Sequence, residues 1–228
     1  MARGGTPVIE ALRDPRMRPV INACLTLSLA IGVFGASFGV GAVTAGASVA
    51  QACVISLLVF TGASQFSAVS VIGAGGSTAS ALGGALLLAA RNGVYGLAMA
   101  RRLDGSLARR LLAAQLTIDE STAMSAAQTD PVAQRLAFWI TGLSLYLFWN
   151  LGTLLGALAG TAIDPKTFGL DAAFPAAYVA MVWPLLRDGR GRLAAALGAA
   201  ICVALIPFVP VGIPILCAAL AVLVGVRR

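Results

Sequence analysis

The 228-residue chain contains no histidine, one lysine and few charges, and each scarcity excludes a class of function. Without histidine there is no imidazole to ligate a metal, act as a base or relay a proton. Charged residues make up 11% of the chain and are absent from residues 19–90. A membrane-spanning helix needs only about 20 mainly apolar residues. The solvent of this stretch is therefore lipid or other protein.

Sequence motifs of catalysis are missing as well. The chain has no GxSxG, HExxH or Walker sequence, and its single lysine is Lys166. A serine nucleophile such as Ser64 would have no histidine to activate it. The four cysteines lie far apart in apolar runs without CxxC spacing, which favours packing over a disulfide or a metal site. We therefore expect no enzyme activity, no cofactor and no bound metal.

Composition places the chain among polytopic membrane proteins, with 59% hydrophobic residues and a mean hydropathy of +0.91. Further uncharged stretches cover residues 136–163, 172–186 and 193–226. We predict an all-α polytopic integral membrane protein with about six to seven transmembrane segments, some of them discontinuous or re-entrant. Residues 1–18 form a cytoplasmic lead-in, and residues 19–228 form a single transmembrane transporter domain.

Apolar runs predict where the segments lie: about 20–43, 48–74, 78–100, 134–160, 172–186, and a short pair at 193–206 and 211–226. A basic loop at 101–110 precedes a moderately apolar stretch at 111–128. The short pair is separated by three prolines, Pro207, Pro210 and Pro214, which remove backbone donors. This pair forms either an interrupted segment that lines a site or two tilted helices joined near the surface.

The formal net charge of +7 comes from arginines that gather beside the apolar segments: Arg13, Arg16, Arg18, Arg101, Arg102, Arg109, Arg110, Arg187, Arg190, Arg192, Arg227 and Arg228. This distribution is typical of cytoplasmic loops and argues against nucleic-acid binding. Three crossings before residue 100 would place the basic loop outside. Either the N-terminus lies outside or one early segment is broken or re-entrant. We favour the second, with both termini cytoplasmic.

A polar stretch interrupts the second apolar segment, FTGASQFSAVS at residues 60–70. Gln65 is costly in hydrocarbon, because its amide needs hydrogen-bond partners. Gly62, flanked by Thr61 and Ser64, predicts a helix break whose free N–H groups could hold a carboxylate. The alternative is that Gln65 bonds a neighbouring helix and only stabilises packing.

Arg91 is the only cation between residues 19 and 100, and it follows the apolar run GGALLLAA. An intramembrane arginine predicts a functional site, and its forked donors suit a substrate carboxylate. Asn92 is adjacent, and Tyr95 lies one helical turn further on. The alternative is an arginine whose side chain extends to the membrane interface from a tilted helix.

Asp119 and Glu120 follow an apolar run within LTIDESTAMS, residues 116–125. They could accept a proton or an amino group, or pair with Arg91. The structural alternative is a capping box in which Thr117 and Glu120 begin a helix. Both interpretations hold together if this helix start faces a cavity.

Spaced glycines mark two of the long segments: Gly35 and Gly39 in the first, Gly152 and Gly156 in the later one. Such GxxxG pairs allow helix backbones to approach closely, so packing is the first explanation. A duplicated transporter half is the second.

Apolar side chains that could hold an aliphatic group lie near the polar candidates: Phe34, Phe66 and Val69. Trp149 and Asn150 lie deep in the segment 134–160. They either line a cavity or serve packing.

Several strings resemble the AzlC-type branched-chain amino acid exporters of bacteria: SFGVGAV, VFTGASQFSAV, RNGVYGLAMARRL, TIDESTA, FWITGLSLYLFWNLGTLLGALAG, FGLDAAFPAAYVA and PFVPVGIPILCAAL. The resemblance covers nearly the whole chain. It implies the large subunit of a two-component exporter in the cell inner membrane that works with a small AzlD-type membrane subunit. It also implies valine, leucine, isoleucine or methionine as substrate. Many members carry histidine where this chain has Asn92.

We therefore expect a membrane transporter that exports branched-chain or similar neutral hydrophobic amino acids. The expected substrate-binding residues are Arg91, Asn92, Thr61, Gly62, Ser64, Gln65, Phe66 and Tyr95. Asp119 and Glu120 are expected to couple to a proton or to the amino group. The alternatives are a scaffold subunit whose partner forms the pathway, and a pore for a small anion or neutral solute.

Overall fold

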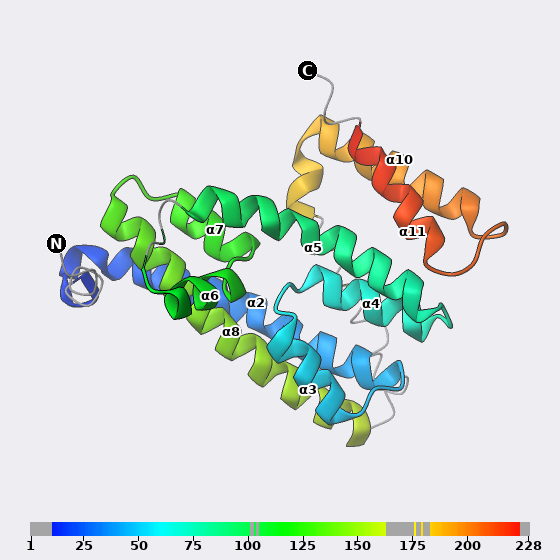
Figure 1. Ribbon diagram of the computed structural model, residues 1–228, viewed down its shortest axis with the longest axis horizontal. Helices are drawn as coiled ribbons and strands as arrows, with labels where there is room; N and C mark the ends of the chain where they lie inside the picture. Colours follow the sequence, from blue (N-terminus) through cyan, green and yellow to red (C-terminus); the bar gives the residue numbers. More distant parts are fainter. Residues whose placement is uncertain are drawn as a thin grey trace.

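The computed structural model describes residues 11–100, 103, 105–162, 176, 179 and 183–223, and these residues form helices and their connections (Figure 1). The predicted all-α fold is confirmed. The α-helices are α2 (Arg18–Thr44), α3 (Val49–Leu58), α4 (Ala63–Gly73), α5 (Thr78–Ala100), α6 (Leu107–Gln115), α7 (Asp119–Ala126), α8 (Pro131–Ala162), α10 (Gly189–Leu205) and α11 (Ile213–Ala218). The 3-10 helices are η1 (Pro15–Met17), η2 (Trp183–Arg187) and η3 (Ala219–Val222).

Most predicted segments have a matching helix, including 20–43, 78–100 and 134–160. Most of the predicted span at 172–186 lies outside the described residues. The same is true of the first ten residues and of Arg101, Arg102, Arg227 and Arg228.

Two helices, α2 and α8, run side by side in the same direction along the molecule. The thiol of Cys24 donates to the carbonyl of Ala137 at 3.8 Å, near the start of both helices. One turn further along α2 and two turns further along α8, the hydroxyl of Ser144 donates to that of Ser28 at 2.8 Å. Because the contacts advance together along both helices, α2 and α8 are parallel, and their N-termini lie at the same end of the molecule.

Glycines make this parallel pair very close. A Cβ atom on Gly35 would run into the backbone of Trp149, and one on Gly156 would run into the backbone of Ala36. The same close approach is found at three further glycines: Gly32, Gly39 and Gly152. The predicted packing role of the spaced glycines is therefore confirmed.

The second apolar segment is broken, as the polar stretch within it predicts. Helix α3 ends at Leu58 and α4 begins at Ala63, so the two helices form a hairpin (Figure 1). A Cβ on Gly73, at the end of α4, would lie 3.3 Å from the Cβ of Ala45, just after α2. The first hairpin (α3–α4) thus starts and finishes at the same end of the molecule, where α2 ends.

The turn of this hairpin, residues 59–62, is called the first tip. It lies against the middle of α8, because the hydroxyl of Tyr146 donates to the carbonyl of Leu57 at 2.9 Å. Tyr146 is the sixteenth of the 32 residues of α8. The first hairpin therefore reaches about halfway along the longest helix and then turns back.

A second hairpin (α6–α7) approaches from the opposite end, after α5 has returned along the molecule. Its turn, residues 116–118, is called the second tip. The predicted basic loop at 101–110 is wrong in its second half, because α6 begins at Leu107. The guanidinium of Arg109 lies 5.6 Å from the ring centre of Trp139, near the start of α8, which fixes the base of this hairpin.

The two tips meet beside the middle of α8. The side-chain amide of Gln115 donates to the carbonyls of Leu57 and Leu58, at 3.0 and 3.3 Å. Leu116 packs against α8, where a Cβ on Gly142 would lie 2.9 Å from its Cβ. These bonds satisfy carbonyls that the end of α3 leaves without helical partners.

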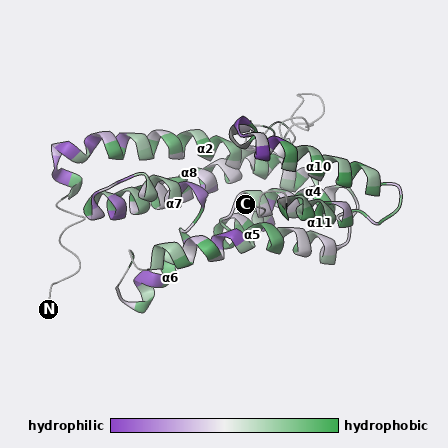
Figure 2. Ribbon diagram, turned by 90° about the horizontal axis from the view of Figure 1, so that it is seen from above, coloured by the Kyte–Doolittle hydropathy of each residue, from purple (hydrophilic) through white to green (hydrophobic). Residues whose placement is uncertain are grey.

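Six arginines of the described residues lie at the end where α2 and α8 begin, which we call the basic end, while Arg187, Arg190 and Arg192 lie around the start of α10 (Figure 2). It includes Arg13, Arg16, Arg18, Arg109, Arg110 and Arg135. Because the first hairpin does not run the length of the molecule, α5 brings the chain back to this end. Three complete crossings before residue 100 are therefore not required, and the side of the membrane that this end faces stays a prediction.

Two of the described helical stretches are long and apolar enough to cross a membrane by length and composition, Pro15–Thr44 and Pro131–Ala162. The number of six to seven spans stays a prediction. The predicted short pair near the C-terminus is present as α10 and α11. Leu216 of α11 lies close to Gly83, so this pair packs against α5.

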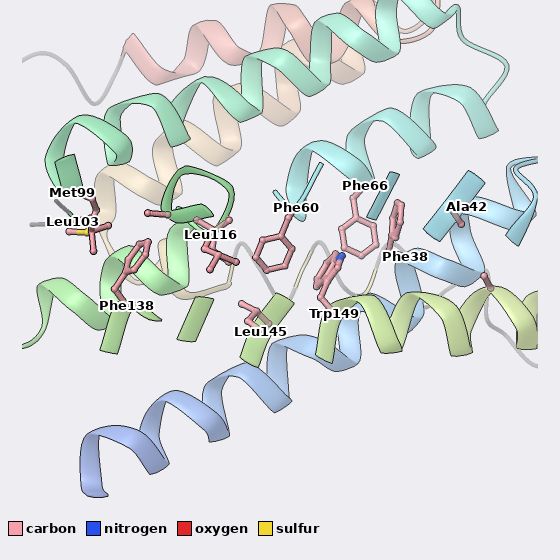
Figure 3. Close-up of a cluster of buried hydrophobic side chains, with 14 residues drawn as sticks. Phe38, Ala42, Phe60, Phe66, Met99, Leu103, Leu116, Phe138, Leu145 and Trp149 are labelled. Carbon is pink, nitrogen blue, oxygen red and sulfur yellow. The ribbon is translucent and has the colours of Figure 1, made fainter. Parts of the chain in front are cut away.

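An aromatic cluster lies behind the first tip, where α2, α4 and α8 meet (Figure 3). The ring of Phe66 meets those of Phe38 and Trp149 edge to face, with centroids 5.9 and 6.0 Å apart. Phe38 and Trp149 are stacked at 6.4 Å. All three side chains are buried, and this packing fixes the start of α4.

Candidate functional site

A central cavity lies between the two tips. Five elements line it: α2, the first tip, α5, the second tip with the start of α7, and α8. The lining residues are Ile31, Phe34, Phe60, Thr61, Gly62, Arg91, Ile118, Asp119, Glu120, Leu145 and Trp149. Its volume is about 40 Å³. One water needs roughly 10–15 Å³, whereas ligand pockets measure about 300–1,000 Å³. The cavity therefore has room for a few waters, and an amino acid would enter only after the walls move.

An ion pair lines this cavity. The Nη2 atom of Arg91, on α5, lies 2.7 Å from the Oδ2 atom of Asp119, at the start of α7. The two side chains are 37% and 35% exposed. The guanidinium thus points into the cavity, and its Nε atom is buried without a hydrogen-bond partner among the residues that the structure describes. Pairing with Arg91 was one of the roles predicted for the acidic residues.

Two neighbours complete the charged group. The hydroxyl of Tyr95, one turn along α5 from Arg91, interacts with the carboxylate of Asp119. Glu120 follows Asp119 in the chain and lines the same cavity. One cation, two carboxyl groups and a phenol therefore lie close together, and the protonation of the carboxyl groups depends on what their neighbours bind.

The first tip presents the start of α4 to the cavity. Gly62 has φ +55°, a left-handed conformation that favours glycine. The side-chain oxygen of Gln65 accepts from the Gly62 N–H at 3.2 Å, and the hydroxyls of Thr61 and Ser64 hydrogen-bond each other. The first bond of the helix runs from the Phe66 N–H to the Gly62 carbonyl at 3.0 Å. The N–H groups between them belong to the positive end of the helix dipole.

Gln65 itself is 1% exposed, and its Nε2 atom has no hydrogen-bond partner among the described residues. The bond of its oxygen is local, to the turn three residues earlier, and does not link neighbouring helices. An orphaned amide nitrogen is costly in a buried place. It marks a position where a ligand or a different side-chain rotamer would be stabilised.

The second tip is built in a different way from the predicted capping box. The hydroxyl of Thr117 donates back to the carbonyl of Ala113 at 2.7 Å and does not cap α7. Instead, the Ser121 hydroxyl accepts from the Ile118 N–H at 3.1 Å. The predicted Thr117–Glu120 box is therefore wrong, because the threonine extends α6. Asp119 and Glu120 do occupy the first turn of α7, where the helix dipole favours negative charge.

The structure brings five of the predicted polar residues to the cavity wall: Thr61, Gly62, Arg91, Asp119 and Glu120. Phe34, expected to contact an aliphatic group, and Trp149, expected either to line a cavity or to serve packing, also line it. Ser64, Gln65 and Phe66 lie behind the wall, on α4. Asn92 is half-buried and is not among the lining residues, and Val69 lines a separate groove.

Sequence reasoning missed four lining residues: Ile31, Phe60, Ile118 and Leu145. Each is an apolar residue in an apolar run, so no local signal distinguishes it from its neighbours. Asn150, expected either to line the cavity or to serve packing, is half-buried and is not among the lining residues. Its Nδ2 donates to the Tyr146 carbonyl at 2.7 Å, while its Oδ1 is buried and lacks a partner in the described region.

Helices broken inside a bundle, with charged groups and free helix ends around a small cavity, are typical of membrane transport proteins. The AzlC protein family model matches residues 26–163, which include both tips and every lining residue of the cavity. This match covers more than half of the chain. The chain therefore belongs to the AzlC family.

Relatives agree with this assignment. The chain is 27% identical over 187 residues to an uncharacterized membrane protein of Helicobacter pylori, covering 79% of this chain and 82% of the relative. An uncharacterized membrane protein of Haemophilus influenzae is 24% identical, with 84% and 78% covered. The branched-chain amino acid transport protein AzlC of Bacillus subtilis is 25% identical over 168 residues, with 72% and 63% covered. No solved structure matches the chain.

Proposed function

We propose that the protein is a membrane transporter that exports branched-chain or similar neutral hydrophobic amino acids. The Arg91–Asp119 ion pair carries this proposal, because it places one positive and one negative group in the wall of a cavity that also has apolar walls. A zwitterionic substrate carries the same two charges. Family membership and the name of the Bacillus subtilis relative support the substrate class.

The substrate carboxylate would bind Arg91 and the start of α4. The guanidinium offers a fork of donors that matches a carboxylate. The N–H groups after Gly62 add the positive end of a helix dipole, and the hydroxyl of Thr61 stands beside them. Release of Asp119 from Arg91 would free both groups for the exchange of one carboxylate for another.

The substrate ammonium would bind Asp119 or Glu120, both in the first turn of α7. While one carboxylate holds the ammonium, the second is available to a proton that couples transport to a gradient. Tyr95 lies beside Asp119 and would share the same hydrogen-bond network.

The aliphatic side chain would lie against the apolar walls. Ile31 and Phe34 on α2 and Leu145 and Trp149 on α8 supply these walls. Burying a branched side chain there gains about 1.5–3 kcal/mol, whereas a charged side chain without a partner would be excluded. This contrast selects neutral hydrophobic amino acids.

In the bacterial inner membrane, α2, α5 and α8 would cross the bilayer, and the two hairpins would enter it from opposite sides. The basic end would face the cytoplasm under the positive-inside rule, with the N- and C-termini on that side. The exposed apolar side chains would contact lipid and a small AzlD-type subunit.

Reconstituted vesicles test this function. We expect wild-type protein, with its small subunit if required, to give saturable valine and leucine flux that lysine and glutamate do not inhibit. Arg91→Gln should reduce this flux by about tenfold or more, as expected when a charge-assisted hydrogen bond worth roughly 1.5–3 kcal/mol is lost. Arg18→Gln, at the start of α2 and far from the cavity, is the matched control and should transport normally.

Two results would refute the proposal. Flux that is present with the small subunit alone would make this chain a scaffold. Flux of anions or neutral solutes that does not saturate and ignores amino acids would make it a pore.

A further inference from the structure

Two consecutive stretches of the chain follow the same plan. The first stretch is the 27-residue α2 followed by α3 and α4, of 10 and 11 residues. The second is the 23-residue α5 followed by α6 and α7, of 9 and 8 residues. In each stretch a long helix runs the length of the molecule, and a hairpin of two short helices then turns back halfway. This repeat differs from the duplication that the spaced glycines of α2 and α8 suggested in the sequence. Those glycines form the packing contact between the two helices.

The two stretches point in opposite directions. Helix α2 leaves the basic end, and its hairpin starts from the far end, because Ala45 lies against Gly73 there. Helix α5 returns to the basic end, and its hairpin starts there, beside Trp139. Figure 1 shows the tips of the two hairpins approaching each other between the long helices. This arrangement is an inverted repeat, a common plan of secondary transporters.

Local chemistry at the two tips also corresponds. In α4 the third residue, Gln65, accepts a hydrogen bond from the N–H of the capping residue Gly62. In α7 the third residue, Ser121, accepts from the N–H of the capping residue Ile118. Both returning helices therefore start at the central cavity with the same side-chain-to-backbone bond.

Each hairpin also borders a groove. Between α3, α4 and the end of α2 lies an outer groove of about 680 Å³, whose walls include Ala45, Val54, Gln65, Ala68 and Ile72. Between α6 and the end of α5 lies an inner groove of about 330 Å³, whose walls include Gly96, Leu107, Leu111 and Ala114. The outer groove lies at the end where α2 finishes, and the inner groove lies at the basic end.

The tips separate these grooves from the cavity. Gln65 lies between the outer groove and the cavity. It lines the outer groove, and its side-chain oxygen accepts a hydrogen bond from the N–H of Gly62, which lines the cavity. Its amide nitrogen is buried without a partner in the described structure. At the second tip, Thr117 lines the inner groove, and the next residue, Ile118, lines the cavity. At the first tip the barrier is a turn of backbone backed by the buried rings of Phe38, Phe66 and Trp149, and at the second tip it is the turn itself.

We infer that the two hairpins are paired gates, each opening the central cavity to one groove, and that both gates are closed in the structure. This inference rests on the proposed transport function and adds the path that the substrate follows through the protein. The substrate amino acid passes from the inner groove, past the second tip, into the cavity, and leaves past Gln65 through the outer groove. Gln65 is the outer gate residue, and its free amide nitrogen binds the passing carboxylate.

Single cysteines test the two routes in a chain whose Cys24, Cys53, Cys202 and Cys217 are replaced by alanine. Ala68→Cys places a thiol in the outer groove and Ala114→Cys places one in the inner groove, while Leu155→Cys, on the exposed apolar face of α8, is the control. A membrane-impermeant methanethiosulfonate reagent labels thiols that water reaches. The Ala68→Cys chain should be labelled from the periplasmic face only, and the Ala114→Cys chain from the cytoplasmic face only.

Saturating valine should change the two labelling rates in opposite directions, each by about threefold or more, because a ligand shifts a two-state equilibrium. Complete labelling of either groove should abolish valine flux, and Leu155→Cys should remain unlabelled and active. Gln65→Ala should lower valine flux about tenfold while leaving the labelling sidedness unchanged, as expected for a lost hydrogen bond to a charged group.

Three outcomes would refute the inference that the hairpins are gates, even if the protein transports valine. One is labelling of both grooves from the same face. Another is no labelling of either groove, which would show that lipid or a partner helix fills them. The third is full labelling without loss of flux. Wild-type vesicles without valine flux would instead refute the proposed function, whatever the sidedness of labelling.

Discussion

The guanidinium of Arg91 lies 2.7 Å from the carboxylate of Asp119, and this contact joins a long helix to the start of a half-length one. Each partner belongs to a different element, since Arg91 is on α5 and Asp119 begins α7. In a partly buried cavity the pair neutralises two charges that would otherwise be costly. The same pair must open when a zwitterion binds, so it links occupancy of the cavity to the position of the second hairpin.

Neutralising one partner should harm stability more than neutralising both. Asp119→Asn leaves Arg91 unpaired, and we expect a loss of about 1–3 kcal/mol, below the value for a fully buried pair because both groups are a third exposed. The double variant Arg91→Gln with Asp119→Asn should recover most of this loss and none of the flux. Thermal unfolding in detergent measures stability, and vesicle flux measures function.

The surface pair of Arg16 and Asp14, 4.0 Å apart, provides the control. Its removal by Arg16→Gln should change stability by less than about 1 kcal/mol. If Asp119→Asn were as mild as this control, the cavity pair would be a solvated contact without a structural role.

Sequence reasoning located the break in the second apolar segment because glycine and a glutamine amide are both out of place in hydrocarbon. Gly62 and Gln65 indeed start α4. The second hairpin escaped prediction, since the turn at Leu116 and Thr117 carries no glycine or proline. Helices that are apolar on all faces give no periodic signal of which side is buried.

The meeting of the two tips could not be read from the sequence either. It depends on tertiary contacts, such as the bond of Gln115 to Leu57, between residues that are 58 positions apart. Arg91 and Asp119 were each singled out by charge alone, and their pairing was one of several roles considered. The two residues pair because the path of α5 brings Arg91 beside Asp119, and the local sequence does not specify that path.

Gly62→Ala tests the backbone conformation of the first tip. At φ +55° a side chain is strained by roughly 1–3 kcal/mol, although the added Cβ would lie an acceptable 3.6 Å from Trp149. We expect valine flux to fall about tenfold, because the N–H groups after Gly62 would shift away from the substrate carboxylate.

Gly75→Ala is the matched control for this change. Gly75 has φ +79° with no atom near an added Cβ, and it lies after α4, away from the cavity. Both variants should lose similar thermal stability, but only Gly62→Ala should lose flux. Equal flux in the two variants would remove the first tip from the binding site.

Gly156→Ala tests the close approach of α2 and α8. The new Cβ would lie 2.7 Å from the Cα of Ala36, which is too close for two carbon atoms. The helices would therefore have to separate. We expect a loss of about 1–3 kcal/mol from overpacking, measured by thermal unfolding in detergent. Gly93→Ala, on α5 with no atom within 4 Å of an added Cβ, should be neutral or stabilising by up to about 1 kcal/mol, because alanine favours helix more than glycine. Equal effects at both positions would mean that the two helices tolerate separation.

Tyr146→Phe and Gln115→Leu remove the side-chain donors that hold the end of α3. Both donate to the Leu57 carbonyl, at 2.9 and 3.0 Å, and a hydrogen bond contributes about 1 kcal/mol. Each change should therefore accelerate hydrogen exchange at the Val59 and Thr61 amides by about fivefold. The phenylalanine ring can still pack on Phe60, whose centroid lies 5.0 Å from that of the tyrosine, so overall stability should change little.

Thr161→Val, which removes a local bond to Leu158 near the end of α8, is the control and should leave exchange at the first tip unchanged. The double variant Tyr146→Phe with Gln115→Leu should also raise the rate at which thiol reagents enter the outer groove, because the first hairpin would open more often. Unchanged exchange at Val59 and Thr61 in the double variant would show that aromatic packing alone holds the first tip. In that case Phe38, Phe66 and Trp149 would set the opening energy of the outer gate.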